Sequence, residues 1–355
     1  MEQLLYLYIV LYNIHKTKWR SDIMKNIVVT GGAGFIGSNL CIHLIHQSDD
    51  NYVICLDNMI TGSRNNIREL LEPPHPRFKL IEADISRALD CRLFGKENID
   101  EIYHLASIAS PEKYKKYSLE TLLTSINGTQ RVLDYCVLYN CKLLFTSTSE
   151  VYGDPLVHPQ PEEYYGNVNT VGERSCYDEG KRVAETLIYE YRKKYGLDLK
   201  IARLFNTYGP KMDLCDGRVI TNFIRQIKNG EPIEIYGDGS QTRSFCYIDD
   251  MIRGLVAFMA SGSNISGPLN LGNPNCEFTM NELAATFMKV LKINDKNEEE
   301  QSNDFSVKYL PKTQDDPMCR KPVIEKALNL IDFKCNVELE DGIQRVWNYF
   351  IDKQK

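Results

Sequence analysis

The chain has 355 residues, of which 43% are apolar and 25% are charged, and its formal net charge is −6. This length accommodates one large α/β domain with a smaller companion, and the acidic balance gives no support for nucleic-acid binding. The 11 cysteines form no CxxC pair and no His/Cys spacing typical of zinc sites. We therefore expect no metal site and a reduced, cytoplasmic setting.

The first 24 residues do not fit the rest of the chain. Residues 4–12 are apolar, but this run is too short to span a bilayer, and no small-residue cleavage site follows it. We expect residues 1–24 to be either a dispensable extension or the product of an upstream start that is little used, and we expect no membrane association.

Residues 25–62 contain a dinucleotide-binding pattern. An apolar run at 27–29 leads into the glycine loop 31–37, a helical pattern follows, and a second apolar run ends at Asp57. In this pattern Gly31 allows a tight turn, Gly34 lets the backbone approach a pyrophosphate, and Gly37 lets the helix pack on the sheet. Asp57 lies about 20 residues past Gly37, where a carboxylate binds both hydroxyls of an adenosine ribose. It would repel a 2′-phosphate, so we expect NAD rather than NADP.

Strands and helices alternate through the first part of the chain. We expect further strands at 78–81, 101–105, 143–146 and 199–204, and long helices at 111–139 and 177–195. This alternation predicts an α/β fold with a doubly wound parallel (Rossmann) sheet. Asp84 follows the third strand, where it either bonds the adenine amino group or caps the next helix.

Shorter elements follow residue 206, separated by Gly, Pro and Asp. We expect them at 219–228, 233–236, 248–259, 269–271, 280–291, 324–330 and 339–351, with a surface loop at 294–304. The pattern predicts a nucleotide-binding domain over 25–205, to which 246–272 returns, and a smaller interleaved substrate domain over most of 206–355.

Candidate catalytic side chains cluster around the predicted fifth strand and the helix after it. Tyr177 and Lys181 are four residues apart on one helical face, and a nearby ammonium lowers the pKa of a phenol. A phenol with a lowered pKa removes a hydroxyl proton while hydride leaves the same carbon. Thr148 would hold the hydroxyl being oxidised. Glu150 is either an acid/base or water-positioning group, or a strand-end carboxylate satisfied by backbone amides.

Several blocks of this sequence resemble the UDP-glucuronic acid decarboxylases (UDP-xylose synthases), in the extended short-chain dehydrogenase/reductase superfamily. The most specific are Ser149-Glu150-Val151-Tyr152-Gly153-Asp154-Pro155 and Cys176-Tyr177-Asp178-Glu179-Gly180-Lys181-Arg182, and others cover 31–37, 57–62, 103–107, 209–223, 236–243 and 314–317. The resemblance implies NAD-dependent oxidation of UDP-glucuronate at carbon 4, loss of CO₂ and re-reduction to UDP-xylose.

The motifs and the resemblance together give three sets of candidate residues. The catalytic set is Thr148, Glu150, Tyr177, Lys181 and Arg320; by resemblance Arg320 meets the substrate carboxylate, although a guanidinium is an unusual proton donor. The cofactor set is Gly31, Gly34, Phe35, Ile36, Gly37, Asp57, Asn58, Thr61, Gly62, Asp84, Ile85, Leu105, Ala106, Ser107, Thr124, Tyr177 and Lys181. The substrate set is Asn206, Arg218, Tyr236, Gln241, Arg243 and Arg320.

Other activities remain open at this level. A nucleotide-sugar 4,6-dehydratase begins with the same oxidation but needs an acid where this chain has Ser149. A 4-epimerase has no use for an arginine at Arg320. A catalytically silent nucleotide-sugar-binding protein would not need Thr148, Tyr177 and Lys181. By family analogy, the outer faces of the helices at 111–139 and 177–195 would form a homodimer interface.

Overall fold

A seven-stranded parallel sheet organises the computed structural model, which describes residues 24–87, 98–291, 306–312 and 317–352. In spatial order the strands are β11 (Leu269–Leu271), β6 (Leu199–Leu204), β5 (Lys142–Thr148), β4 (Glu101–His104), β1 (Lys25–Thr30), β2 (Asn51–Asp57) and β3 (Phe78–Glu82). All neighbouring strands are parallel, so their carboxyl ends meet at one edge. The predicted doubly wound α/β fold is confirmed. The expected extension, the loop at 294–304 and residues 314–316 lie outside the described residues.

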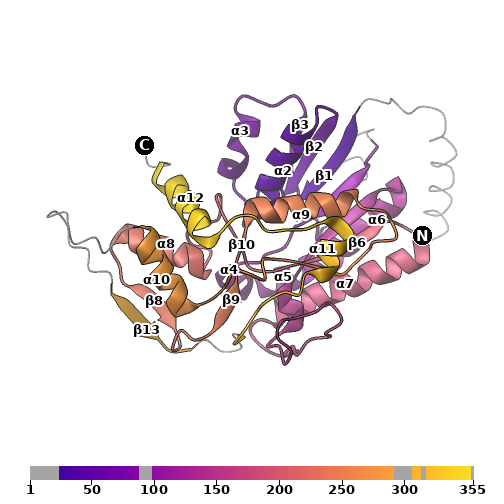
Figure 1. The fold of residues 1–355 in the computed structure, drawn as a ribbon. Coiled ribbons are helices and arrows are strands. Elements are labelled where there is room, and N and C mark those ends of the chain that lie inside the picture. The colour runs from indigo at the N-terminus through magenta and orange to yellow at the C-terminus, as the bar shows by residue number, and fades with distance from the viewer. Residues whose placement is uncertain (1–23, 88–97, 292–305, 313–316, 353–355) are drawn as a thin grey trace.

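Helices connect these strands and cover both faces of the sheet (Figure 1). The first is α2 (Phe35–Gln47), followed by the short η1 (Arg64–Ile67) and α3 (Arg68–Leu71) between β2 and β3. The helix α7 (Ser175–Tyr195) precedes β6, and α9 (Ile248–Ala260) precedes β11. A short turn, η4 (Ser149–Tyr152), directly continues β5.

The prediction of one long helix over 111–139 is wrong. The segment instead comprises α4 (Pro111–Lys116), α5 (Ser118–Leu123), the π-helical turn η3 (Thr124–Gly128) and α6 (Thr129–Tyr139). Tyr117 has φ −117° and ψ 51°, which are not helical angles, and this interrupts the helix. The helix is therefore interrupted before α5, and α4 lines the cavity described below.

The second part of the chain forms a lobe beside the carboxyl edge of the sheet, seen at lower left in Figure 1. Its elements are α8 (Val219–Asn229), β8 (Ile233–Tyr236), β9 (Thr242–Ser244), β12 (Glu277–Thr279), α10 (Met280–Val290) and β13 (Val307–Leu310). The strand β13 pairs with β8, and β12 pairs with β9. The pair β7 (Thr207–Tyr208) and β10 (Cys246–Tyr247) joins this lobe to the sheet, and α11 (Glu325–Ile331) and α12 (Leu339–Asp352) end the fold.

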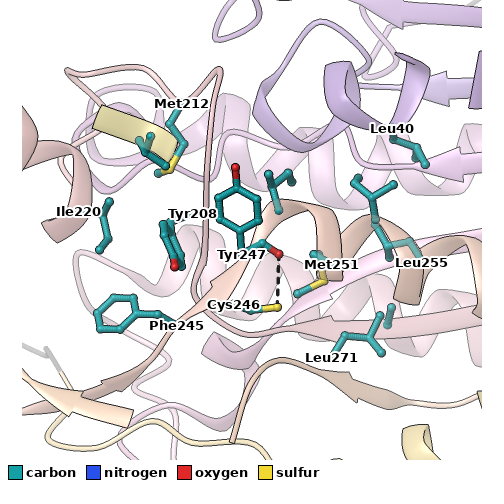
Figure 2. Packing of buried hydrophobic residues seen from close by; sticks show 14 of the residues in the cluster. Leu40, Tyr208, Met212, Ile220, Phe245, Cys246, Tyr247, Met251, Leu255 and Leu271 are labelled. Carbon is teal, nitrogen blue, oxygen red and sulfur yellow. Dashed lines mark hydrogen bonds between the residues drawn. The ribbon is translucent and has the colours of Figure 1, made fainter. Parts of the chain in front are cut away.

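The lobe and the sheet share one hydrophobic core. Figure 2 shows buried side chains running from Ile220 of α8 and Phe245, through Tyr247 and Met251 of α9, to Leu40 of α2. Burial of a large apolar side chain stabilises a fold by about 1.5–3 kcal/mol, so this continuous cluster fixes the lobe against the sheet. The cavity between them therefore has walls held by common packing.

Candidate active site

A cavity of about 480 Å³ lies where the carboxyl edge of the sheet faces the lobe. Residues at the ends of successive strands form its floor: Gly31 after β1, Asp57 at the end of β2, Leu105 after β4 and Thr148 at the end of β5. The lobe contributes the opposite wall. Parallel α/β sheets bind ligands at this edge, so the cavity is the candidate active site.

The glycine loop has the shape that a dinucleotide pyrophosphate needs. Gly31 has φ +70°, a left-handed conformation that favours glycine, and a Cβ on Gly37 would lie only 2.1 Å from the Gly31 carbonyl oxygen. Gly34 precedes α2, and no side chain caps this helix. The amides at the start of α2 are therefore available to an anion in the cavity.

Asp57 is fixed against this loop. One carboxylate oxygen accepts a hydrogen bond from the Ala33 amide at 3.0 Å, and the other accepts one from the Met59 amide at 2.9 Å. Burial raises the pKa of this carboxyl, and the two amides oppose that effect. A fixed carboxylate beside the glycine loop fits the adenosine ribose of NAD, so the residues present fit this cofactor.

Most of the predicted residues line the same cavity. Of the three candidate sets, only Gly62 and Asp84 are absent from its wall. Gly62 lies behind Asp57, where a Cβ would be 2.7 Å from Oδ1. Asp84 instead accepts hydrogen bonds from the amide and hydroxyl of Ser86, at 2.9 and 2.7 Å. These two hydrogen bonds form a local turn. The residues after Arg87, where the capped helix was expected, lie outside the described residues.

Tyr177, Lys181 and Thr148 meet at the end of β5. Tyr177 has a hydrogen bond with the Thr148 hydroxyl, and Lys181 Nζ donates to the Thr146 carbonyl at 2.8 Å and lies 6.0 Å from the Tyr177 ring centroid. Burial lowers the pKa of Lys181 to about 7. The expected lowering of the Tyr177 pKa is wrong for the protein alone, because burial raises it to about 12 despite the opposing charge of Arg218. Lys181 loses charge when desolvated, which weakens its influence on the phenol.

Glu150 lies between two arginines. Arg320 Nη1 and Nη2 contact its two carboxylate oxygens at 2.7 and 2.8 Å, and Arg174 Nη2 contacts one of them at 2.5 Å. Burial opposes ionisation of Glu150, but Arg320 and Arg174 outweigh it and lower the pKa to about 2. The expectation of a perturbed acid here is confirmed. Side chains rather than backbone amides bind this carboxylate.

The lobe provides more cationic groups along the cavity. Arg218 pairs with Asp216 at 3.0 Å and donates to the Ala109 carbonyl at 2.9 Å. Arg243 is buried and donates to the Thr242 carbonyl at 2.8 Å. Gln241 Nε2 donates to the Tyr236 carbonyl at 2.7 Å, and Asn206 lines the wall after β6. These groups suit an elongated anion such as a nucleoside diphosphate.

The sequence reasoning missed three residues of this site: Arg174, Tyr114 and Asp178. Tyr114 stacks on the Tyr177 ring with centroids 5.3 Å apart and planes at 4°. Asp178 Oδ2 lies 3.9 Å from Arg174 Nε, and burial followed by the charge of Glu150 raises the Asp178 pKa to about 8. One signal was available for Arg174, since a buried Glu150 needs cations and Arg174 precedes Tyr177 by three residues.

Within the described residues there is neither a metal-binding cluster nor a membrane-spanning helix. Within residues 24–87, 98–291, 306–312 and 317–352, no group of three or more His, Cys, Asp or Glu side chains is arranged to hold a metal ion. Over the same part of the chain, no helix has both the length and the apolarity required to traverse a bilayer.

The class of protein follows from a family match and from similar solved structures. The sequence profile of the NAD dependent epimerase/dehydratase family matches residues 27–272. Among solved structures, a UDP-glucuronic acid 4-epimerase from Bacillus cereus, in complex with UDP-glucuronic acid and NAD, has a TM-score of 0.81 at 28% identity over 92% of this chain and 99% of its own. A UDP-N-acetylglucosamine 4-epimerase from Methanobrevibacter ruminantium has the same TM-score at 29% identity, covering 93% of this chain and 99% of its own.

Relatives of higher identity define the subgroup. UDP-glucuronic acid decarboxylase 6 from Arabidopsis thaliana is 47% identical over 317 residues, covering 89% of this chain and 86% of the relative. UDP-glucuronic acid decarboxylase 1 from Danio rerio is 44% identical over 326 residues, covering 92% of this chain and 72% of the relative. The chain therefore belongs to the UDP-glucuronic acid decarboxylases of the NAD-dependent epimerase/dehydratase family.

Proposed function

We propose that this protein is an NAD-dependent UDP-glucuronate decarboxylase that produces UDP-xylose and CO₂. The supporting observation is the proximity of two groups in one cavity. The Thr148–Tyr177–Lys181 set carries oxidation chemistry, and the Arg320–Glu150–Arg174 cluster suits a substrate carboxylate. The identity to known decarboxylases supports the same activity.

NAD is the proposed cofactor, with the glycine loop at its pyrophosphate and Asp57 at its adenosine ribose. Bound there, it would supply the hydride acceptor for the oxidation at carbon 4 of the sugar and the hydride donor for the later reduction. The nicotinamide end would then lie near Tyr177 and Lys181, which line the cavity beyond the loop. Because the cofactor is regenerated in each turnover, the protein needs no exchange of NAD between cycles.

Tyr177 is the proposed base for the hydroxyl on carbon 4. Its pKa of about 12 in the protein alone means that the phenol is protonated at neutral pH. Tyr177 therefore acts as a base once positive charge near it, such as that of an oxidised nicotinamide, has lowered this pKa and its own proton has left. Thr148 orients the hydroxyls of Tyr177 and the sugar. The proton remains on Tyr177 until the ketone is reduced, when it returns to the oxygen on carbon 4.

Decarboxylation follows from the position of that ketone, which is β to the carboxylate on carbon 6. The bond between carbons 5 and 6 breaks, CO₂ leaves, and the electron pair forms an enolate across carbons 4 and 5. A proton from water then adds to carbon 5 and restores the ketone on carbon 4, which is the group that is reduced. Arg320 is proposed to bind the carboxylate through its planar guanidinium. Glu150, with a pKa of about 2, is ionised throughout and orients groups at carbon 5 rather than donating a proton.

One assay tests this function. The full chain is incubated with NAD and UDP-glucuronate, and CO₂ and nucleotide sugars are quantified; UDP-glucose is supplied in a parallel reaction. We expect CO₂ and UDP-xylose from the first substrate and no 4-keto-6-deoxy sugar from the second. A 4-keto-6-deoxy product without CO₂ would indicate a dehydratase instead.

Epimerisation at carbon 4 is the second candidate, because a structural neighbour is a 4-epimerase crystallised with UDP-glucuronic acid. An epimerase would keep the carboxylate and form UDP-galacturonate. The same assay separates the two activities, since only decarboxylation releases CO₂. The bidentate Arg320–Glu150 pair beside Tyr177 favours the decarboxylase.

We also propose the division of the chain into an NAD-binding domain over 25–205 and a mainly UDP-sugar-binding domain over 206–355. The pairing of β11 with β6 supports the return of 246–272 to the first domain. In this division Asn206, Arg218, Tyr236, Gln241 and Arg243 bind the UDP portion, and their positions on the lobe side of the cavity support that role.

A homodimer in the cytoplasm is the proposed form of the protein. The helices α5 and α7 pack together, and Leu119, Leu123 and Val183 on them are 70%, 47% and 38% exposed. Exposed apolar side chains on adjacent helices support a self-complementary interface. Free thiols at every cysteine of the described residues support a reducing compartment. Light scattering of the parent and of Leu119→Glu tests the dimer, and a monomeric parent would refute it.

A further inference from the structure

Arg174 contacts the Glu150 carboxylate, and it takes no part in the mechanism proposed above. We propose that Arg174 is a positioning residue that holds the Glu150 carboxylate ionised and in place while Arg320 turns to the substrate carboxylate. This inference rests on the proposed function.

The two arginines reach Glu150 from different parts of the chain. Arg174 immediately precedes α7, and its carbonyl accepts the amides of Tyr177 and Asp178 at 3.0 and 3.1 Å. Arg174 is therefore fastened to the helix that carries Tyr177. Glu150 lies in η4, where its amide donates to Thr148 Oγ1 at 3.2 Å. The Arg174–Glu150 contact thus joins two segments of the sheet-bearing part.

Arg320 belongs to the other side of the cavity. Its carbonyl accepts the Ser244 amide at 3.0 Å, so the backbone at this position runs along β9 of the lobe. Its Nη atoms are both on Glu150, and its buried Nε has no hydrogen-bond partner among the described residues. Of the two ion pairs, Arg320–Glu150 joins the lobe to the end of β5 across the cavity, whereas Arg174–Glu150 does not. Substrate entry would therefore disturb the Arg320–Glu150 pair.

Charge balance explains why a second cation is needed. A substrate carboxylate at Arg320 competes with Glu150 for the same guanidinium. If Arg320 were its only partner, Glu150 would remain buried without a cation, and it would take up a proton. With Arg174 present, two guanidiniums serve two carboxylates, and Glu150 keeps its charge.

Other charged and titratable groups act on Glu150 as well. They are Arg218 and Arg243, the carboxyl of Asp178, and the phenols of Tyr114 and Tyr177. The Asp178 carboxyl also lies near Arg174, with its Oδ2 atom 3.9 Å from Arg174 Nε. Because its pKa is raised to about 8, Asp178 is mostly neutral at pH 7 and leaves the charge of Arg174 to Glu150.

The first test compares the pH dependence of turnover in Arg174→Met, Arg174→Lys and the parent, with Arg68→Met as a surface control. Arg68 forms an exposed ion pair with Glu72 and lies outside the cavity wall. We expect Arg174→Met to lower kcat at pH 6 at least tenfold. We also expect the acidic limb of the pH profile of kcat to shift to higher pH by one pH unit or more. The Michaelis constant for UDP-glucuronate should change less than threefold, and Arg174→Lys should recover most of the turnover.

The second test does not require turnover. Infrared difference spectra of each variant against the same variant carrying Glu150→Gln report the protonated carboxyl of Glu150. In Arg174→Met at pH 6, binding of UDP-glucuronate should increase the band of the protonated Glu150 carboxyl. UDP-xylose, which has no carboxylate, should leave that band unchanged. In the parent, neither ligand should increase the band. Arg174→Gln is a second variant without the cation and should give the same reading as Arg174→Met, while Arg174→Lys should behave like the parent, so a misfolded Arg174→Met does not leave the question open.

The outcomes separate this inference from the proposed function. A parent that releases no CO₂ refutes the function, while the infrared comparison still reports on Glu150. An unmoved acidic limb with a raised Michaelis constant would make Arg174 a substrate contact and overturn the positioning role. Unchanged Glu150 protonation in Arg174→Met with UDP-glucuronate bound would overturn it too.

Discussion

Both Nη atoms of Arg320 contact the carboxylate of Glu150, at 2.7 and 2.8 Å, although the two residues are 170 positions apart in the chain. The pair spans the cavity from the lobe to the end of β5. It lies beside Tyr177, so a substrate that reaches Tyr177 also reaches Arg320. Recognition of a carboxylate and oxidation of a hydroxyl are thereby placed in one site.

Replacing Arg320 with Met should weaken UDP-glucuronate binding by about 2 kcal/mol or more, roughly thirtyfold, because a buried charge partner is removed. Binding of UDP should not change, since it has no sugar carboxylate. Titration calorimetry with the two ligands measures the difference directly. Equal losses for UDP and UDP-glucuronate would show that Arg320 acts on the nucleotide or on the fold, and not on the carboxylate.

Replacing Tyr177 with Phe should reduce kcat for CO₂ release by about 10²–10⁴-fold, the usual contribution of a positioned acid or base. The stacking on Tyr114 involves the ring and not the hydroxyl, so the variant should retain its fold and its NAD. Bound NAD is measured by extraction after gel filtration, and turnover by CO₂ release. Near-parental turnover would remove Tyr177 from the mechanism.

Local patterns in the sequence were sufficient for much of the fold. The strand at 199–204 was predicted with the bounds that the structure has, because an apolar run between breakers determines a strand locally. The element at 233–236 was predicted with the right bounds but without its type, and it is a strand. The glycine loop and Asp57 were equally readable, since their spacing reflects one continuous βαβ unit.

Contacts between segments that are distant in the chain could not be predicted from local sequence patterns. The pairing of β13 with β8, and the two arginines on Glu150, join residues whose separation leaves no periodic trace. The pKa of Tyr177 was misjudged for a related reason. The four-residue spacing to Lys181 was visible, but the depth of burial that neutralises both groups depends on the whole fold.

Replacing Asp178 with Asn should stabilise the protein at alkaline pH. The folded-state pKa of Asp178, about 8, lies above the ordinary value of 3.8, so the folded state binds the proton more tightly than the unfolded state does. Stability from this group is complete below pH 4 and is lost as the pH rises to 8. The asparagine cannot ionise, so it avoids that loss.

Urea unfolding at pH 5 and pH 8.5 measures this effect. We expect the free energy of unfolding of Asp178→Asn, relative to the parent, to be higher at pH 8.5 than at pH 5 by at least about 1.4 kcal/mol, the equivalent of one pKa unit. Asp49→Asn is the control, because the Asp49 side chain is 100% exposed. The same difference at both pH values would mean that Asp178 is not protonated in the folded protein.

Replacing Asp57 with Asn should change the choice of cofactor. The carboxylate is held by the Ala33 and Met59 amides at the end of β2, where it accepts ribose hydroxyls and repels a 2′-phosphate. The amide side chain has no charge, so the repulsion disappears. Its single oxygen accepts from only one of the two backbone amides, so one of these hydrogen bonds to the loop is lost. We expect weaker NAD binding and tighter NADP binding, with the ratio of the two dissociation constants shifting at least tenfold toward NADP. Fluorescence titration with each dinucleotide measures that ratio, and an unchanged ratio would place the adenosine ribose away from Asp57.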